Sequence, residues 1–276
     1  MSRNQDRLGG AQQPDTSPPP QQGGGGFSFV VPTEYVDLPS QGRYYPEGHP
    51  LHGEDTIEIR QMTAKEEDIL TSATLLKKGI ALDKVVENII VDKRIDPRTL
   101  LVGDRNAIII AARVSGYGPE YNVTLTCPAC TEKEQKVFSL NLAEVNHAND
   151  FRDIGVVHEG AGIFSVNLVK LQGVQVQFSL MNGYDEKALI KSNKEMNNLV
   201  TKQLYRIIHS VNGDSSPATI RSLIENLPML DTRIIRAAYK AANPNVELNY
   251  LFSCSNCSNE QELEGPITAE FFWPEQ

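Results

Sequence analysis

The chain has 276 residues, 40% of them hydrophobic, and a formal net charge of −9 at pH 7. This length suits one large domain or two of ordinary size, each with a buried core. The negative charge argues against a general nucleic-acid-binding protein, which needs a basic face for phosphates. The sequence holds no run of about 18 apolar residues, so we expect no stable membrane insertion.

The N-terminal segment MSRNQDRLGGAQQPDTSPPPQQGGGG is rich in Pro, Gln and Gly and nearly free of large apolar side chains. Such a composition cannot bury enough surface to offset the loss of backbone entropy on folding. We predict that residues 1–26 form a disordered tail, either free in solution or ordered only against a partner.

The chain after this tail begins with extended segments and continues with helices. YVDLPSQGRYYP and DTIEIRQM predict a β-hairpin with a long loop. Thr63 with Glu66 predicts a helix start, because the two side chains can satisfy free N–H groups of a first turn. The Asp-Pro step at 96–97 predicts a second helix start, with proline at the first helical position. A helix over DRNAIIIAAR (104–113) then leads to the first pair of cysteines.

The second half repeats this order of elements. FSVNLVKLQGVQVQFSL (164–180) alternates apolar and polar residues and predicts a β-hairpin. Asn182 with Asp185 predicts one helix start, and the Ser-Pro step at 216–217 predicts another. A helix over DTRIIRAAYK (231–240) leads to the second pair of cysteines.

The two halves therefore match as an internal repeat. Cys127 and Cys254 are separated by 127 positions, and so are Asp104 and Asp231. Seven additional residues lie between the Ser-Pro step and the second aspartate, which predicts a longer helix in the second copy. Chance resemblance of two helix–strand units is the alternative. We predict an α+β fold of two pseudo-symmetric lobes, residues 27–145 and 146–276, each made of a β-hairpin, helices and a cysteine turn.

The four cysteines of the chain form two C-x-x-C pairs. Such a pair can be half of a zinc site, a redox dithiol or a structural disulfide. A redox cysteine usually begins a helix, whereas TEKEQKVFSL and SNEQELEGPI, which follow the two pairs, are strand-like. Two strand–turn–strand knuckles can complete a tetrahedral four-thiolate site. We therefore predict a zinc ribbon that joins the lobes, with disulfides and redox chemistry as alternatives. The predicted ligands of one structural Zn²⁺ per chain are Cys127, Cys130, Cys254 and Cys257.

No pattern of catalytic residues is recognisable. The five histidines form no H-x-x-x-H pair and accompany no nucleophile motif. His49 and His52 in EGHPLHG could be half of a metal site, but a polar turn is the simpler interpretation. The four glycines at 23–26 lie in the tail rather than between a strand and a helix, so they predict no phosphate loop. We predict that the chain is not an enzyme.

One stretch resembles a known family. VDLPSQGRYYPEGHPL (36–51), followed by EIRQMTAKEEDIL, is similar to the baseplate hub and hub-assembly proteins of T-even-like contractile-tailed phages. The resemblance covers roughly residues 35–130. It implies a structural subunit of the hub in the virion tail baseplate, assembled in the host cytoplasm, where metal ligation is favoured over disulfides. The partners implied are other hub proteins and the tail-tube and spike proteins.

The copy number and two other functions are open questions at this point. As the resemblance implies, a six-fold tail ends in a three-fold spike, and three copies of a two-lobed chain would offer six similar lobes. We therefore predict a homo-oligomer, specifically a trimer. A hub assembly chaperone absent from the mature virion is an alternative. A zinc-ribbon regulator that binds nucleic acid is another, disfavoured by the acidic residues near the second knuckle, which are Glu260, Glu262 and Glu264.

Overall fold

A computed structural model describes residues 30–192, 198–264 and 269–272. The chain divides into two units, Met1–Val31 and Pro32–Gln276, and the fold lies in the second. The predicted tail, residues 1–26, lies outside the described residues. The division of the remainder into lobes 27–145 and 146–276 stays a prediction.

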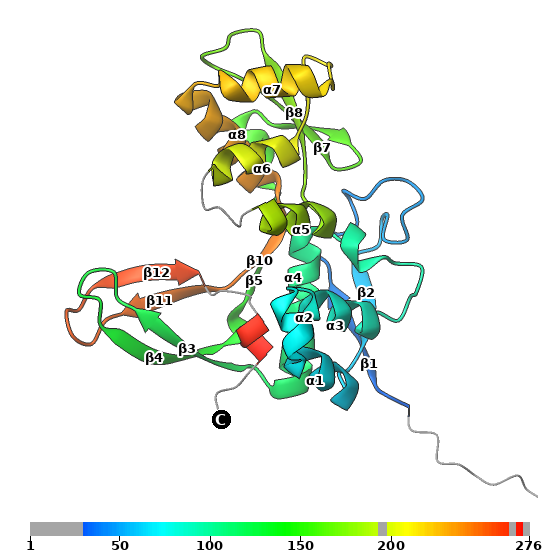
Figure 1. The fold of residues 1–276 in the computed structure, drawn as a ribbon, viewed down its shortest axis with the longest axis vertical. Coiled ribbons are helices and arrows are strands. Elements are labelled where there is room, and N and C mark those ends of the chain that lie inside the picture. The colour runs from blue at the N-terminus through cyan, green and yellow to red at the C-terminus, as the bar shows by residue number, and fades with distance from the viewer. Residues whose placement is uncertain (1–29, 193–197, 265–268, 273–276) are drawn as a thin grey trace, which may run out of the picture. The chain divides into compact units, whose positions relative to one another are not determined.

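The first half contains a β-hairpin, a group of short helices, one long helix and a second hairpin (Figure 1). In chain order the elements are β1 (Thr33–Asp37), β2 (Thr56–Arg60), α1 (Ala64–Thr71), α2 (Ala73–Lys77), α3 (Ala81–Ile89), η1 (Pro97–Thr99), α4 (Val102–Tyr117), β3 (Glu120–Thr126) and β4 (Lys133–Ser139). A short connection follows, with η2 (Leu140–Leu142), β5 (Glu144–Asn146), η3 (Asp150–Ile154) and β6 (Val157–Gly160).

The second half repeats this order within the described residues. Its elements are β7 (Ile163–Asn167), β8 (Gln175–Ser179), α5 (Gly183–Ser192), α6 (Leu199–Ile207), β9 (Ile208–Val211), α7 (Pro217–Glu225), α8 (Met229–Ala242), β10 (Asn245–Glu247), β11 (Asn249–Ser253), β12 (Glu260–Glu264) and η4 (Ala269–Phe272). The α+β prediction is confirmed.

Strand pairing follows the same plan in both halves. β1 and β2 pair antiparallel, as do β7 and β8 at the equivalent position. β8 also pairs with β9, and the first half has the corresponding contact as a single bridge from Ile59 to Ile90. β6 extends the second sheet to four strands, in the order β6-β7-β8-β9.

The helices that begin at the predicted positions differ in length. α1 begins after Thr63, as predicted, and α5 begins after Asn182. The Ser-Pro step begins α7, which has nine residues, whereas the Asp-Pro step begins only a three-residue 3₁₀ turn. The prediction of a longer second-copy helix is therefore right, and the helix start predicted at Asp96–Pro97 is present but continues for only one 3₁₀ turn. Too few residues separate Pro97 from α4 for a further helix to form.

A buried aspartate ties the long helix of each half to the loop after the first strand of its hairpin. Asp104 at the start of α4 accepts hydrogen bonds from the N–H and hydroxyl of Ser40, at 2.9 and 2.6 Å, and from the Tyr45 hydroxyl at 2.7 Å. Asp231 at the start of α8 accepts from three successive backbone N–H groups, those of residues 169–171, at 2.9–3.0 Å. Both carboxylates are 0% exposed. The 127-residue offset thus corresponds to equivalent positions in space.

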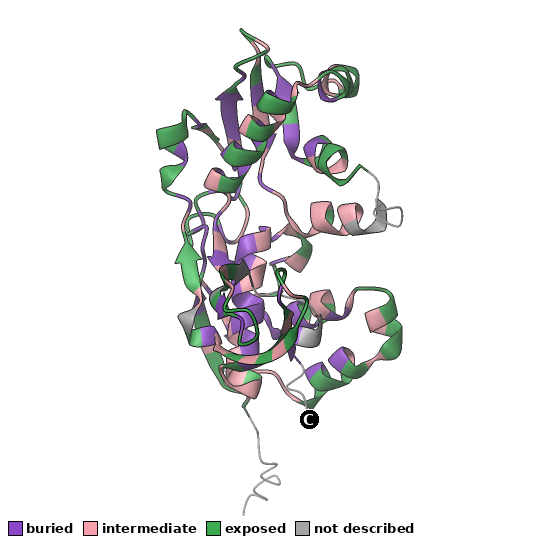
Figure 2. Cartoon of the chain, turned by 90° about the vertical axis from the view of Figure 1, so that its left-hand side faces the viewer, coloured by how far each residue is buried: buried purple, intermediate pink, exposed green. Residues whose placement is uncertain are grey.

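One hydrophobic core includes residues of both halves. Ile59, Ile89 and Ile108 belong to it from the first half, and Phe178 and Ile235 from the second. Buried segments occur in the sheet of the second half and in the long helix of the first (Figure 2). β5 also pairs with β10, across the boundary between the repeats.

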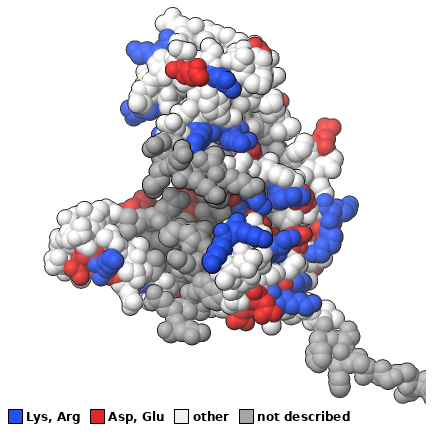
Figure 3. All heavy atoms as spheres, in the orientation of Figure 1, with Lys and Arg blue, Asp and Glu red and all other residues white. Residues whose placement is uncertain are grey.

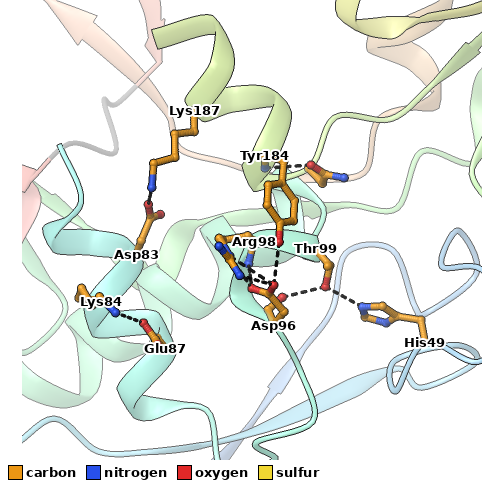
Figure 4. Close-up of polar contacts among 10 residues, drawn as sticks. His49, Asp83, Lys84, Glu87, Asp96, Arg98, Thr99, Tyr184 and Lys187 are labelled. Carbon is orange, nitrogen blue, oxygen red and sulfur yellow. Dashed lines mark hydrogen bonds and ion pairs between the residues drawn. The ribbon is translucent and has the colours of Figure 1, made fainter. Parts of the chain in front are cut away.

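Polar contacts also join α3 and η1 of the first half to α5 of the second (Figure 4). The Tyr184 hydroxyl donates to Asp96 at 2.9 Å, and Lys187 lies 3.7 Å from the carboxylate of Asp83. Arg105 of α4 bridges Asp83 and Glu186. These contacts hold α5, the first helix of the second half, against α3, η1 and α4 of the first half.

The helix start at Thr63 predicts a measurable acid sensitivity. The buried carboxylate of Glu66 accepts from the N–H and hydroxyl of Thr63, at 2.9 and 2.8 Å, and from Arg60 at 2.7 Å. Burial alone would raise the pKa of Glu66, but hydrogen bonds from Arg60 and Thr63 lower it to about 2. This group therefore stabilises the fold above its ordinary pKa of 4.5, and the stabilisation is lost as the pH falls toward 2.

We expect Glu66→Gln to reduce the free energy of unfolding at pH 7 by about 2 kcal/mol, because a helix cap and a charged hydrogen bond are both weakened. Urea unfolding at pH 7 and pH 3 measures this, and the difference between variant and wild type should shrink at pH 3. Glu67→Gln, at the exposed neighbouring position, is the control. An equal loss for both variants would contradict the assignment.

Candidate metal centre

The tips of two hairpins bring the four cysteines together. Figure 1 shows β3–β4 and β11–β12 lying beside each other. The Cys127 and Cys257 sulfurs are 3.6 Å apart, and so are the Cys130 and Cys254 sulfurs. All four Sγ atoms lie within 4.8 Å of one another. Each close contact joins one cysteine of each pair, so neither C-x-x-C sequence forms a site by itself.

The two cysteine turns have the same backbone geometry. The N–H of Thr131 donates to the carbonyl of Cys127 at 2.8 Å, and the N–H of Ser258 donates to that of Cys254 at 2.9 Å. Thr131 and Ser258 both have left-handed backbones, with φ of 60° and 54°. This conformation reverses the chain directly after the second cysteine, so that both thiols of a turn point the same way.

The four thiols fit a tetrahedral metal ion. A sulfur–metal bond of about 2.3 Å in a tetrahedron places the sulfurs about 3.8 Å apart, close to the contacts described above. All four cysteines are free rather than disulfide-bonded, and a disulfide would need a sulfur separation of about 2.05 Å. Cys127 and Cys254 are buried at 0% and 2% exposure and pack with Phe252.

The pKa values of two of the thiols are shifted in opposite directions. The pKa of Cys130 is lowered to about 7, first by the backbone N–H of Glu132 and then by the Asn256 side chain. For Cys254, the backbone N–H of Cys257 favours the thiolate, but burial and the neighbouring Cys130 and Glu134 outweigh it and raise the pKa to about 12. Thiolates this close repel one another, so without a cation they cannot all ionise near neutral pH.

A second contact between the hairpins was not predicted from the sequence. The carboxylate of Glu134 on β4 accepts from the N–H and hydroxyl of Ser255, at 2.6 and 2.8 Å, within the other cysteine turn. Lys136 pairs with Glu134 at 2.9 Å and lies 5.9 Å from the centre of the Phe252 ring. The sequence around the first cysteine pair gives little signal for this contact, because Glu132 and Glu134 alternate with Lys133 and Lys136.

The two histidines considered as half of a metal site make other contacts. His49 stacks on Tyr45, with ring centres 4.4 Å apart, and its Nε2 lies 2.9 Å from the Thr99 hydroxyl (Figure 4). His52 Nδ1 lies 2.7 Å from the carbonyl of Tyr45. Among the described residues, the cysteines form the only group of three or more potential ligands close enough to share a metal ion.

A cavity of about 450 Å³, which we call the α3–α5 pocket, is the other notable charged feature. Lys and Arg side chains gather over this region of the face in Figure 3. Three of its cations, Lys84, Arg98 and Lys187, pair with carboxylates in the same pocket, at 2.5–3.7 Å. Arg94 pairs with Asp92, and Lys93 donates to carbonyls at the end of α3. The charged side chains of this pocket therefore mainly bind one another and nearby backbone groups, and we assign no ligand to it.

A family model described as T4 bacteriophage base plate protein matches residues 32–273. No curated protein and no solved structure matches the chain. In the part of the chain that the structure describes, no helix has both the length and the apolar character required to cross a bilayer.

Proposed function

This chain belongs to the T4 bacteriophage base plate protein family, and we propose that within the baseplate it is a structural, non-enzymatic subunit of the central hub. The family match over residues 32–273 carries this proposal. The resemblance of residues 36–51 to hub and hub-assembly proteins supports the hub over other parts of the baseplate. Its partners would be other hub proteins and the neighbouring tail-tube and spike proteins.

Quantitative mass spectrometry of purified virions tests this role. A structural subunit appears at a fixed number of copies per particle and is located at the tail tip in a cryo-EM map. A chain present in infected cells but missing from virions would instead be an assembly chaperone. Density elsewhere in the baseplate would contradict the hub assignment.

The proposal includes one structural Zn²⁺ held by Cys127, Cys130, Cys254 and Cys257. The sulfur separations of 3.6 Å between the two turns support it. A four-thiolate site leaves no ligand position open, so the ion would stabilise the ribbon rather than activate a substrate. Assembly in the reducing host cytoplasm would keep the thiols available for metal.

We also propose a trimeric arrangement at the junction between six-fold and three-fold parts of the tail. The equivalent contacts of Asp104 and Asp231 support the idea that each chain presents two similar units. The subunit contacts would run from the first half of one chain to the second half of the next. Counting copies in a reconstruction without imposed symmetry tests this, and any number other than three would contradict it.

A further inference from the structure

A second, smaller pocket lies where the loop after β1 meets η3 and β6. Its volume is about 260 Å³. It is lined by Arg43, Tyr44, Asn149, Phe151, Arg152 and His158. Arg43 and Tyr44 belong to the SQGRYYP stretch, in which Ser40 and Tyr45 bind the buried Asp104. We call it the Arg43–Arg152 pocket.

Packed aromatic rings form one side of this pocket. Tyr44 and Phe151 are buried, and both contact Phe164 with ring centres 5.3 Å apart. The His158 ring lies 4.8 Å from Phe164 and meets Tyr44 edge-on at 5.2 Å. Rings held by several neighbours give a fixed, largely apolar surface, beside which charges interact more strongly than in water.

The two arginines bring positive charge without a carboxylate partner. Arg43 donates to the carbonyls of Ser40 and His147 and to the side-chain oxygen of Asn149, at 2.9–3.4 Å. All three acceptors are neutral. Arg152 lies 5.9 Å from the centre of the Phe151 ring. Within the described residues neither arginine forms an ion pair, unlike Lys84, Arg98 and Lys187 of the α3–α5 pocket.

His158 adds a ring nitrogen that has no partner. Its Nε2 is buried and makes no hydrogen bond to any described residue. Burial and the nearby charges of Arg43 and Arg152 lower the pKa of His158, although Glu159 opposes this. The Glu159 carboxylate itself accepts from the Ser165 hydroxyl at 2.6 Å. Buried polar atoms in native proteins usually have a hydrogen-bond partner, and one that lacks a protein partner calls for an explanation such as a bound water or ion.

We propose that the Arg43–Arg152 pocket binds the carboxylate of an Asp or Glu side chain from a partner protein of the baseplate. The two guanidinium groups supply charge and donors suited to a planar carboxylate. His158 can donate from Nε2, and the aromatic side can contact the methylene groups of the ligand. A neutral histidine and a small pocket favour a singly charged carboxylate over a phosphate.

The test uses the full chain and N-acetyl-glutamate amide, which presents one side-chain carboxylate between capped backbone groups. The His158 ring signals in a carbon–proton NMR spectrum should shift and saturate at millimolar concentrations of this probe. N-acetyl-glutamine amide, which lacks the charge, should give no saturable shift. Inorganic phosphate should bind more weakly than the glutamate probe.

Arg152→Gln should weaken binding about tenfold, because one charged hydrogen bond is lost. The Arg152 side chain is exposed and makes no hydrogen bond to a described residue, and the backbone carbonyl that accepts from Gly155 is kept in this variant, so the protein should fold normally. Arg221→Gln, which removes an exposed arginine of α7, is the matched control and should bind as wild type. Equal binding by the two variants, or equal binding of the glutamate and glutamine probes, would overturn the proposal. Tighter binding of phosphate would overturn the carboxylate assignment. These measurements need no virion, so they are independent of the hub proposal.

Discussion

Replacing Cys254 with serine should abolish binding of the proposed zinc ion and release both cysteine hairpins together. Each close sulfur contact joins the two hairpins, so loss of one ligand weakens a site that both share. Metal-binding free energy in such sites is folding free energy, about 10–16 kcal/mol for small zinc-binding peptides. We expect the bound zinc to fall from one equivalent per chain to well below one.

Elemental analysis of protein purified without added metal gives the stoichiometry, and hydrogen exchange reports on the hairpins. In wild type, a chelator should increase amide exchange in β3–β4 and in β11–β12 at the same rate. Ser255→Ala is the matched control, since it removes a contact to Glu134 within the same turn but no thiol. Full zinc content in the Cys254→Ser protein would contradict a shared site.

The four cysteine ligands also predict how zinc binding should depend on pH. Each thiolate must lose its proton to bind metal, so zinc affinity falls as the pH decreases. We expect release of zinc on acidification to accompany the increase in hairpin exchange. Zinc release at a pH where both hairpins stay protected would show that the metal is not what holds them together.

Substitution by asparagine should destabilise the protein much more at Asp231 than at Asp104, although both carboxylates are buried. In Asp231→Asn the amide can keep one acceptor oxygen, but its NH₂ group must then face a backbone N–H of residues 169–171. A buried donor is left unpaired, and we expect a loss of about 3 kcal/mol at pH 7. In Asp104→Asn the hydroxyls of Ser40 and Tyr45 can rotate and accept from the NH₂ group. The loss there should be about 1 kcal/mol or less.

The pH dependence of the two variants distinguishes this explanation from a simple difference in packing. For Asp231, burial raises the pKa, but the three backbone N–H groups outweigh it and lower the pKa below its ordinary value of 3.8. The ionised group therefore stabilises the fold above that value, and this contribution is lost as the pH falls below it. The loss caused by Asp231→Asn should accordingly become smaller in acid.

For Asp104 the pKa shift has the opposite direction, so the pH dependence of its contribution to stability is also opposite. Burial, only partly opposed by hydrogen bonds from Ser40 and Tyr45, raises the pKa above its ordinary value of 3.8. Wild type therefore gains stability as the pH falls through the raised pKa, whereas the asparagine variant does not. The loss caused by Asp104→Asn should become larger in acid. Chemical unfolding of both variants at pH 7 and pH 3 measures these trends, and parallel trends would contradict the assignment.

Local rules in the sequence determined much of this protein. The C-x-x-C pairs, the Thr63–Glu66 helix start and the hairpin over 164–180 depend on neighbours close in the chain, so their residues alone specify them. The repeat was also visible, because Asp104 and Asp231 keep a fixed distance from the cysteines of their own half. The family followed from a short motif and agrees with a match over residues 32–273.

Only the tertiary structure decided which groups from distant parts of the chain meet. The sulfurs of Cys127 and Cys257 come within 3.6 Å although 130 residues separate them, and Glu134 reaches Ser255 over 121 residues. Arg43 and Arg152 flank one pocket because the loop after β1 packs against η3. Such contacts depend on the packing of a core common to both halves. Sequence periodicity reports which face of an element is buried, but not which other element covers it.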